Sequence, residues 1–162
     1  MKKNVLKKII IFYPSFERGG VEIILLNLIN FFLKKKIEIV LIASNIKKGV
    51  FKNKKFQSRI VKKEPFTIMP DRISKALTAS KILISEIKKS DKKNTIILSL
   101  QGSSLAILVS KFLGFKIIVR NAEDAISSTY FAENKIQSLI ILFLKIILYN
   151  FSDKIISNSK GS

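Results

Sequence analysis

Residues 9–22 read IIIFYPSFERGGVE, where an apolar run ends at a proline and a pair of glycines precedes the next segment. The run 9–12 has the composition of a buried strand, and residues 21–33 repeat apolar side chains at helical spacing. Gly19 and Gly20 have no side chain, so the backbone there can take positive φ and approach a ligand closely. The first N–H groups of the following helix favour a phosphate. This arrangement predicts the opening of an α/β domain that handles nucleotides, although it matches neither G-x-G-x-x-G nor a Walker A loop.

The composition is that of one well-packed domain with a strong positive charge. The chain has 162 residues, 48% of them hydrophobic, which is enough for a sizeable core. It carries 30 Lys and Arg against 11 Asp and Glu, a net charge of +19, which indicates polyanionic partners such as anionic lipid, nucleic acid or phosphorylated ligands. Because the cations are almost all lysine, a compositional bias of the source genome is an equally open explanation of this charge.

Cysteine and histidine are both absent from the sequence. Their absence excludes a Ser-His-Asp triad, an imidazole base, a thiolate nucleophile and metal sites built from these residues. No metal site is therefore predicted, and no catalytic residue can be assigned from composition. The start MKKNVLKK lacks the core and the cleavage site of a signal peptide, so we expect it to be uncleaved.

Strand and helix patterns alternate along the rest of the chain. Further strands are predicted at 37–44, 95–100, 115–119 and 154–157, with short extended pieces near 59–61 and 66–69. Further helices are predicted at 72–89, capped by Asp71 and with an apolar stripe of Ile73, Leu77, Ile84 and Ile87, then from 103 to a stop at Gly114, and at 136–151. This alternation predicts a Rossmann-like, doubly wound and mostly parallel sheet with right-handed crossovers.

Ligands of such sheets bind at the carboxyl ends of the strands. The residues that fall there are Gly19 and Gly20, Gln101-Gly102-Ser103, Arg120-Asn121 and Asn158-Ser159. They come from four separate segments, and we expect the fold to bring them together at one edge of the sheet.

Two segments leave membrane or nucleic-acid binding open. Segment 136–151 is apolar almost all round but is shorter than the roughly 20 residues that a spanning helix needs, so it is either a core helix against the sheet or a helix with a membrane-seated face. The basic segment 47–63 has one arginine and two aromatic residues, so a solvated surface is favoured over a nucleic-acid site.

Three stretches resemble the N-terminal domain of GT-B glycosyltransferases, in particular retaining glycosyltransferase family 4. They are FYPSFERGGVEIILLNLINFFLKKKIEIVLIAS, IILSLQGSSLAILVSKFLGFKIIVRN and LYNFSDKIISNSKGS, at 12–44, 96–121 and 148–162. The resemblance covers nearly the whole chain and implies one acceptor-side domain at 1–162. It implies a transferase that moves a sugar from a nucleotide-sugar donor to a glycan or lipid-linked acceptor, in cell-surface polysaccharide synthesis, cytoplasmic and peripheral on the inner face of the membrane. The nucleotide sugar is a substrate, and no cofactor is expected.

The resemblance also implies roles for individual residues. Gly19 and Gly20 match a loop that approaches the donor diphosphate, with Glu22 beside it, and Arg120 and Asn121 match polar residues that face the cleft. Gln101 and Gly102 occupy the equivalent edge after another strand, and Ser159 matches the serine after the last strand of the domain. Structural alternatives stay open: a tight turn at the glycines, a helix-terminus charge at Glu22, an ion pair of Arg120 with Glu123 or Asp124, and a helix cap at Ser159.

The sequence departs from the family in two respects. Many members carry a histidine in the cleft, whereas this chain has none. The family's second domain, which supplies the Arg/Lys pair and the E-x7-E carboxylates for the donor, has no counterpart within these 162 residues. We therefore expect the polypeptide alone to be inactive or nearly so, because it lacks the cations that stabilise the leaving diphosphate. A C-terminal donor domain or a partner subunit would have to supply them.

Two other classes of function remain open at this point. One is a non-catalytic basic module that binds anionic membrane or a phosphosugar ligand, which salt-sensitive binding to anionic vesicles would reveal. The other is a nucleic-acid-associated Rossmann-like domain, which a steep salt dependence of binding would reveal. Nucleic acid is the least favoured partner, because arginine is scarce and no nucleic-acid motif is present.

Overall fold

The computed structural model of the chain describes residues 6–14, 20–43, 56–60, 71–101, 103–121 and 135–157. Their elements follow in the order β1 (Lys8–Tyr13), α1 (Gly20–Lys34), β2 (Glu38–Ala43), β3 (Gln57–Ile60), α2 (Asp71–Lys88), β4 (Thr95–Ser99), α3 (Ser103–Phe112), β5 (Lys116–Asn121), α5 (Lys135–Tyr149) and β6 (Lys154–Ser157). The extended piece expected at 66–69 lies outside the described residues, and so does most of the basic segment 47–63.

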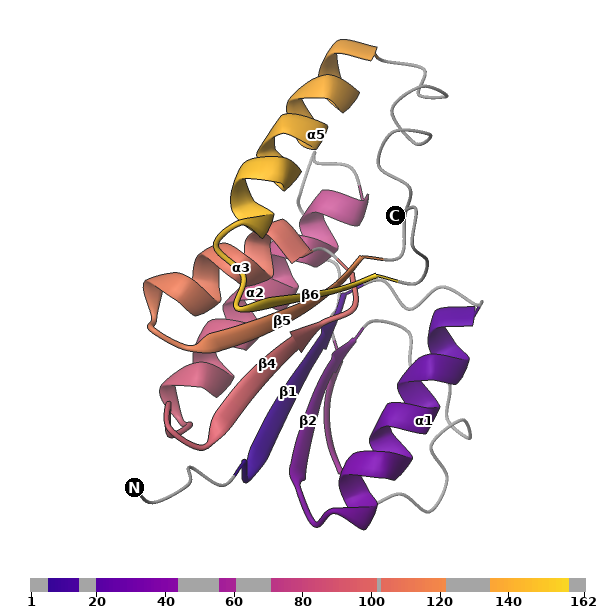
Figure 1. Ribbon diagram of the computed structural model, residues 1–162, viewed down its shortest axis with the longest axis vertical. Coiled ribbons are helices and arrows are strands. Elements are labelled where there is room, and N and C mark those ends of the chain that lie inside the picture. Colours follow the sequence, from indigo (N-terminus) through magenta and orange to yellow (C-terminus); the bar gives the residue numbers. More distant parts are fainter. Residues whose placement is uncertain are drawn as a thin grey trace.

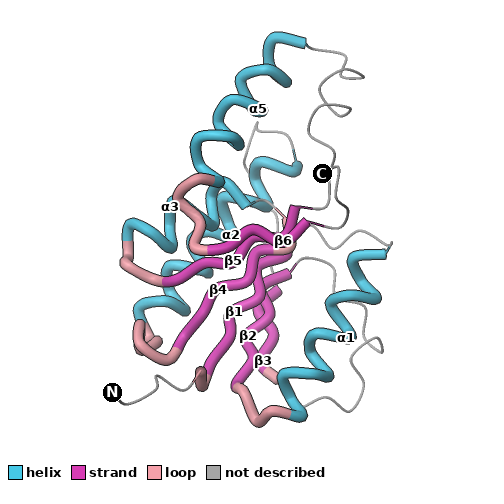
Figure 2. Tube along the Cα trace, in the orientation of Figure 1, coloured by secondary structure: helices cyan, strands magenta, loops and turns pink. Residues whose placement is uncertain are grey.

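The strands form one six-stranded sheet in the order β3-β2-β1-β4-β5-β6, and every neighbouring pair is parallel. Helix α1 lies on one face of the sheet, and α2, α3 and α5 lie on the other (Figures 1 and 2). The predicted doubly wound, Rossmann-like architecture is therefore confirmed. From β1 the order runs outward to β2, whereas from β4 it runs outward to β5 in the opposite direction, so the strand order reverses between β1 and β4.

The core consists of two apolar layers, one on each face of the sheet. Alternate residues of a strand point to opposite faces, so Ile10 and Phe12 pack under α2 and α3 while Ile9 and Ile11 pack under α1. The interior strands are apolar on both faces and almost completely buried, as expected for parallel strands covered by helices. This layering explains why the strands could be recognised as continuous apolar runs.

Helix α2 differs from the prediction in the residues that it buries. Its buried apolar residues are Ala79, Leu83 and Ile87, whereas Leu77 of the predicted stripe is exposed and Ile84 is only partly buried. These three residues are spaced i, i+4 and i+8 and pack in the core, and α2 contacts α3 as well as β1 and β2.

Helix α5 contacts α3, and Leu148 and Tyr149 at its end pack against the core. Its outer side chains Leu139, Phe143 and Ile146 are exposed. The interpretation of this segment as a core helix clamped against the sheet is thus wrong for its outer face, because α5 packs on α3 and much of it extends past the sheet (Figure 1). Among the described helices, none combines the length and the hydropathy needed to cross a membrane.

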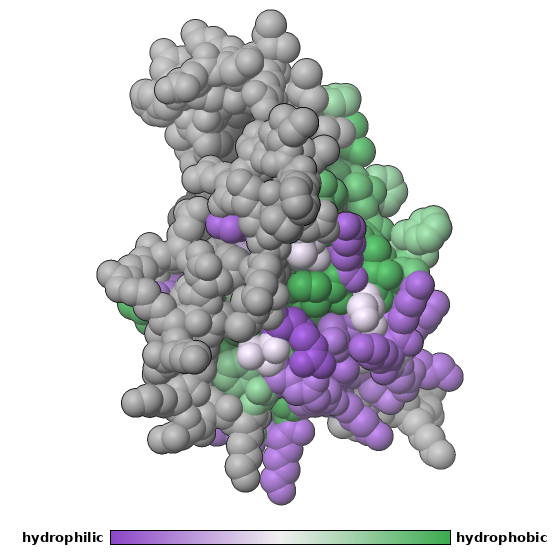
Figure 3. Space-filling model, turned by 180° about the vertical axis from the view of Figure 1, so that it is seen from behind, coloured by the Kyte–Doolittle hydropathy of each residue, from purple (hydrophilic) through white to green (hydrophobic). Residues whose placement is uncertain are grey.

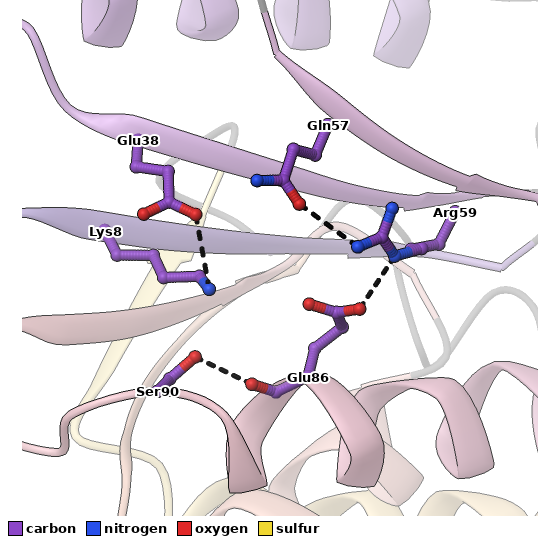
Figure 4. Close-up of polar contacts among 6 residues, drawn as sticks. All are labelled: Lys8, Glu38, Gln57, Arg59, Glu86 and Ser90. Atoms are coloured by element: carbon purple, nitrogen blue, oxygen red, sulfur yellow. Dashed lines mark hydrogen bonds and ion pairs between the residues drawn. The ribbon is translucent and has the colours of Figure 1, made fainter.

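Ion pairs and hydrogen bonds between side chains connect the strands to one another and to a helix. Lys8 pairs with Glu38 at the start of β1 and β2, with an Nζ–Oε1 distance of 3.3 Å. On β3, Arg59 donates from Nε to Oε1 of the buried Glu86 of α2 over 2.7 Å and from Nη2 to Gln57 Oε1 over 3.1 Å (Figure 4). The short strand β3 is therefore tied to a helix as well as to β2.

Asp153 fastens β6 at the other side of the sheet. Its Oδ2 accepts hydrogen bonds from Lys111 Nζ at 2.6 Å and from the backbone N–H of Ile117 at 2.7 Å, and its own N–H donates to the Ile117 carbonyl. Burial raises the pKa of Asp153, but the bonds from Lys111 and Ile117 and the charges of Lys111 and Lys116 outweigh it, so the pKa lies below its ordinary value of 3.8. The aspartate of the S-D-x-I-I stretch thus has a structural role at the amino-terminal edge of the sheet.

Candidate functional site

The candidate site lies at the carboxyl edge of the sheet, where β1 and β4 are neighbours and the chain leaves them toward opposite sides. Loops that diverge in this way leave a crevice between them, which is the usual ligand site of doubly wound sheets. The pairing of the two strands continues to this edge, because the N–H of Leu100 donates to the Phe12 carbonyl at 3.0 Å. The pairing of β1 with β4 therefore extends one residue past the end of β4.

Helix α1 begins at this edge with Gly20, and Glu22 lies partly exposed in its first turn. Gly20 does not have the positive φ that the sequence allows, and a Cβ placed on it would meet no atom within 4 Å. Its small size therefore leaves open space beside the helix N-terminus, rather than serving the turn. Gly19 lies outside the described residues.

The turn after β4 is held by two serine hydroxyls. Ser99 at the end of β4 and Ser103 at the start of α3 are buried, and their Oγ atoms lie 3.1 Å apart. Ser99 Oγ also donates to the backbone carbonyl of Gln101 at 3.2 Å. These bonds fix Gln101, which is partly buried at the edge, while Gly102 lies outside the described residues.

Arg120 and Asn121 lie at the end of β5, within the strand rather than after it as predicted, because they continue the ladder with Ile156 and Ser157 of β6. The Arg120 side chain is well covered, since the residue is only 8% exposed. Because side chains alternate along a strand, Arg120 lies on the same face as Ile118, which packs in the core layer under α1. Arg120 therefore shares both the face and the edge on which α1 begins, and it lies two strands away from β1, which corresponds to about 10 Å.

The fold thus brings Gly20, Glu22, Gln101, Arg120 and Asn121 to one edge, from strands that are direct neighbours in the sheet. Ser159 lies outside the described residues, and the preceding strand β6 ends at the same edge. Glu123 and Asp124, the alternative partners of Arg120, also lie outside them. Whether these residues bind a ligand stays a prediction.

Sequence reasoning did not single out Ser99. The available signal was a serine that ends an apolar strand four residues before another serine at a helix start, a spacing that allows the two hydroxyls to meet across the turn. The two hydroxyls set where Gln101 and the start of α3 lie.

The electrostatics of this edge favour an anionic ligand. A helix N-terminus carries partial positive charge, and a guanidinium that is largely withdrawn from water interacts strongly with an anion because few water molecules screen it. Within the described part of the chain, no group of three or more Asp or Glu side chains could hold a metal ion. Positive charge from the α1 N-terminus and from Arg120 thus lies at one edge of the sheet, where Glu22 adds a negative charge.

Comparison with known proteins gives matches at the level of structure. No protein-family model matches the sequence, and no curated protein matches it either. UGT2 of Phytolacca americana, solved with UDP-2-fluoro-glucose and pterostilbene, matches with a TM-score of 0.66 and 10% identity over 96% of this chain and 48% of that one. UGT89C1 of Arabidopsis thaliana in complex with UDP matches with a TM-score of 0.57 and 13% identity, over 95% of this chain and 45% of that one.

A third solved structure, a UGT transferase from Siraitia grosvenorii in complex with UDP, has a TM-score of 0.53 and 12% identity over 76% of this chain and 30% of that one. All three are GT-B UDP-glycosyltransferases. At these identities the likeness shows the fold alone, a Rossmann-like domain of the kind that GT-B glycosyltransferases contain. The chain spans at most about half the length of these structures.

Proposed function

We propose that this chain is the N-terminal, acceptor-side domain of a glycosyltransferase similar to retaining family 4, which takes a sugar from a nucleotide-sugar donor. The observation that carries the proposal is the match of 96% of the chain to about half of a UDP-glycosyltransferase, joined to a carboxyl edge at which a helix N-terminus and Arg120 lie on the same face of the sheet. Neither feature alone would suffice, because the Rossmann-like fold serves many functions.

In this proposal the crevice between β1 and β4 holds the reacting groups. The N-terminus of α1, with Gly19 and Gly20, approaches the donor diphosphate, and Glu22 and Gln101 contact the sugars. Arg120 supplies positive charge to the phosphates, and Asn121, Gly102 and Ser159 line the same edge. The main electrostatic requirement of such a site is to stabilise the charge that develops on the leaving diphosphate. The single buried guanidinium of Arg120 would supply only part of the positive charge needed.

The remaining cations would come from a donor-binding domain or partner subunit, so the 162-residue chain by itself is proposed to be inactive. The acceptor is proposed to be a glycan or lipid-linked sugar of the cell surface, with the enzyme on the cytoplasmic side of the membrane. The excess of lysine over acidic residues is compatible with acceptors that carry phosphate groups.

The proposal is tested on the protein as purified from its source cells, with whatever donor domain accompanies it. Nucleotide release is measured for several nucleotide sugars, with and without lipid extract as acceptor. Arg120→Gln is expected to lower kcat/KM about thirtyfold, as for loss of a charged hydrogen bond. Lys116→Gln removes the same charge from the same strand at the opposite edge of the sheet and is expected to change little. Release from no nucleotide sugar, or an equal effect of both substitutions, would overturn the proposal.

A second test separates ligand approach at Gly20 from a structural role. Since an added Cβ would meet no neighbour and φ is not positive there, Gly20→Ala is expected to leave thermal stability unchanged. If the donor approaches this residue, the same variant raises KM for the nucleotide sugar. An unchanged KM would remove Gly20 from the site, whereas a fall in stability would contradict the structure itself.

A further inference from the structure

An apolar surface is exposed on the side of the molecule opposite α1. It is made of Leu108 and Phe112 of α3 and Leu139, Phe143, Ile146 and Ile147 of α5, and we refer to these six residues as the α3–α5 surface. The two helices contact each other. Figure 3 shows apolar side chains along the side of the molecule where these helices lie, above a group of hydrophilic side chains.

The exposed apolar residues of α5 lie on one side of the helix. Leu139, Phe143, Ile146 and Ile147 are spaced i, i+4, i+7 and i+8, which places them in one stripe along the helix. Leu148 and the neighbouring Tyr149 face the core instead. Among the α5 side chains that the structure describes, those of the outer stripe therefore contribute little to the stability of the folded domain.

The charged residues around this surface are almost all positive. Four described lysines come from α3, β5, α5 and β6, namely Lys111, Lys116, Lys145 and Lys154, and the single acid of these elements and their described connections, Asp153, is engaged by Lys111. Lys116 and Lys154 are exposed at the starts of β5 and β6. An apolar stripe with a lysine border is complementary to a bilayer surface that carries anionic headgroups over an apolar interior.

We propose that the α3–α5 surface docks the protein onto an anionic lipid bilayer, with α5 lying in the interface and its outer stripe inserted among the acyl chains. This mode of binding needs no spanning helix, and 15 residues suffice for a helix that lies in the plane of the membrane. The inference is independent of sugar transfer, because it rests on the exposed stripe and its lysines and uses no residue of the candidate site.

The chemistry of the surface favours a bilayer over other occupants. Its six residues are aliphatic or phenylalanine and offer no hydrogen bonds, whereas a protein–protein interface typically carries about one hydrogen bond per 100–200 Å². A second copy would bring the same lysines face to face. A nucleic acid would find cations but would leave the apolar stripe in water.

The test is flotation of the full 162-residue chain with vesicles of phosphatidylcholine rich in phosphatidylglycerol, and with vesicles of phosphatidylcholine alone. We expect binding to the anionic vesicles that weakens with salt, and much weaker binding to the neutral ones. Replacing Phe143 and Ile146 by Ser together should lower the partition coefficient roughly 30- to 100-fold, since both side chains would lose their burial in the membrane. Lys154→Gln should lower it about fivefold.

Helix α1 provides a matched control on the opposite face of the sheet. Ile23 and Phe31 are 63% and 54% exposed, close to the 58% of Ile146 and the 64% of Phe143. The double replacement of Ile23 and Phe31 by Ser should therefore leave vesicle binding unchanged, and circular dichroism should show all variants folded.

Three outcomes would overturn the proposal. One is the absence of vesicle binding, including the case in which size-exclusion chromatography shows a dimer that the Phe143/Ile146 variant abolishes, which would assign the surface to a second copy. Another is equal loss of binding in the α1 control, which would indicate general stickiness. The last is binding that depends on lysines but not on Phe143 and Ile146, which would indicate purely electrostatic contact.

Discussion

The β1–α1–β2 unit and the β4–α3–β5 unit have the same strand–helix–strand order and similar turns. They differ in the side on which the second strand is added and in the face of the sheet that the helix covers. Each joins its helix to the next strand through three residues, 35–37 and 113–115, with the same three backbone hydrogen bonds closing the helix. Their second strands lie on opposite sides of the β1–β4 pair, so their helices cover opposite faces. The reversal places the first turn of α1 and the start of α3 at the same edge of the sheet, which explains why the candidate site lies between the units.

The outer strands show a second difference between the two sides of the sheet. Strand β2 is buried except for its first residue and is followed by β3, which the Arg59–Glu86 pair ties to α2. Strand β6 is exposed along its whole length and is tied by Asp153, while the helix before it exposes an apolar stripe. Similar apolar composition therefore produces a core on one side of the sheet and an available surface on the other.

The largest expected effect on stability is the difference between replacing a buried isoleucine of the core and replacing an exposed isoleucine of α5. Ile97 of β4 is fully buried, and Ile97→Ala should lower the free energy of unfolding by about 3 kcal/mol, because it removes buried methyl groups and leaves a cavity. Ile146→Ala on α5 should change it by less than about 0.5 kcal/mol. Urea denaturation measures both, and similar losses would mean that the outer stripe of α5 is covered in the folded protein.

The fastening of β3 should depend strongly on which partner is removed. Glu86 is only 4% exposed, so Arg59→Met leaves a buried carboxylate without its cation and should cost about 2 kcal/mol. Glu86→Met and the double variant should cost less, because the partly exposed Arg59 can be hydrated. Lys8→Met breaks the pair with the half-exposed Glu38 and should cost at most about 0.5 kcal/mol. A double-mutant cycle by urea denaturation checks the order, which would be refuted if Glu86→Met were the more damaging change.

The fastening of β6 should depend on pH in the acidic range. Because the pKa of Asp153 is lowered in the folded state, its contribution is complete above the ordinary value of 3.8 and is lost as the pH falls through the folded value. Asp153→Asn should cost about 1 kcal/mol at neutral pH, a modest figure because the side chain is partly solvated, and should cost progressively less below pH 3.8. Denaturation curves of both proteins at several pH values test this, and a cost independent of pH would rule out the carboxylate as its source.

The strands could be predicted from sequence because parallel strands covered on both faces are continuous apolar runs, as in β1, β2 and β4. The edge where the candidate residues meet follows from the same alternation. The face that a helix buries depends on how it packs against neighbouring elements, so the exposure of Leu77 could not be foreseen, whereas an exposed face on 136–151 was one of the two alternatives that the sequence left open. Apolar residues all round a helix are compatible with either burial or exposure.

The candidate site was predictable in position but not in detail. The sequence places Arg120 after a strand, but only the pairing with β6 shows that it lies within the ladder, and only the face of the sheet shows that it lies on the side of α1. The polar residue Asp153 sits in a stretch that the resemblance singles out, yet its partners Lys111 and Ile117 are 42 and 36 residues away in the chain. Contacts of that range cannot be inferred from local patterns.

The smallest expected effect lies in the two closing turns, where positive φ occurs at Lys36 in one and at Gly114 in the other. Lys36 adopts a left-handed conformation that is strained for a residue with a side chain and unstrained for glycine. Lys36→Gly should therefore raise the free energy of unfolding by about 0.5 kcal/mol, a modest gain because glycine also makes the unfolded chain more flexible.

Gly114→Ala should lower the free energy of unfolding by about 1 kcal/mol, because φ is 74° and the new Cβ would approach Lys92 Nζ to 3.2 Å, from which that flexible side chain can move. Thermal denaturation of the two single variants should therefore shift the midpoint in opposite directions. Shifts in the same direction would mean that the two turns do not share one geometry, and that the likeness between the two units ends at their hydrogen bonds.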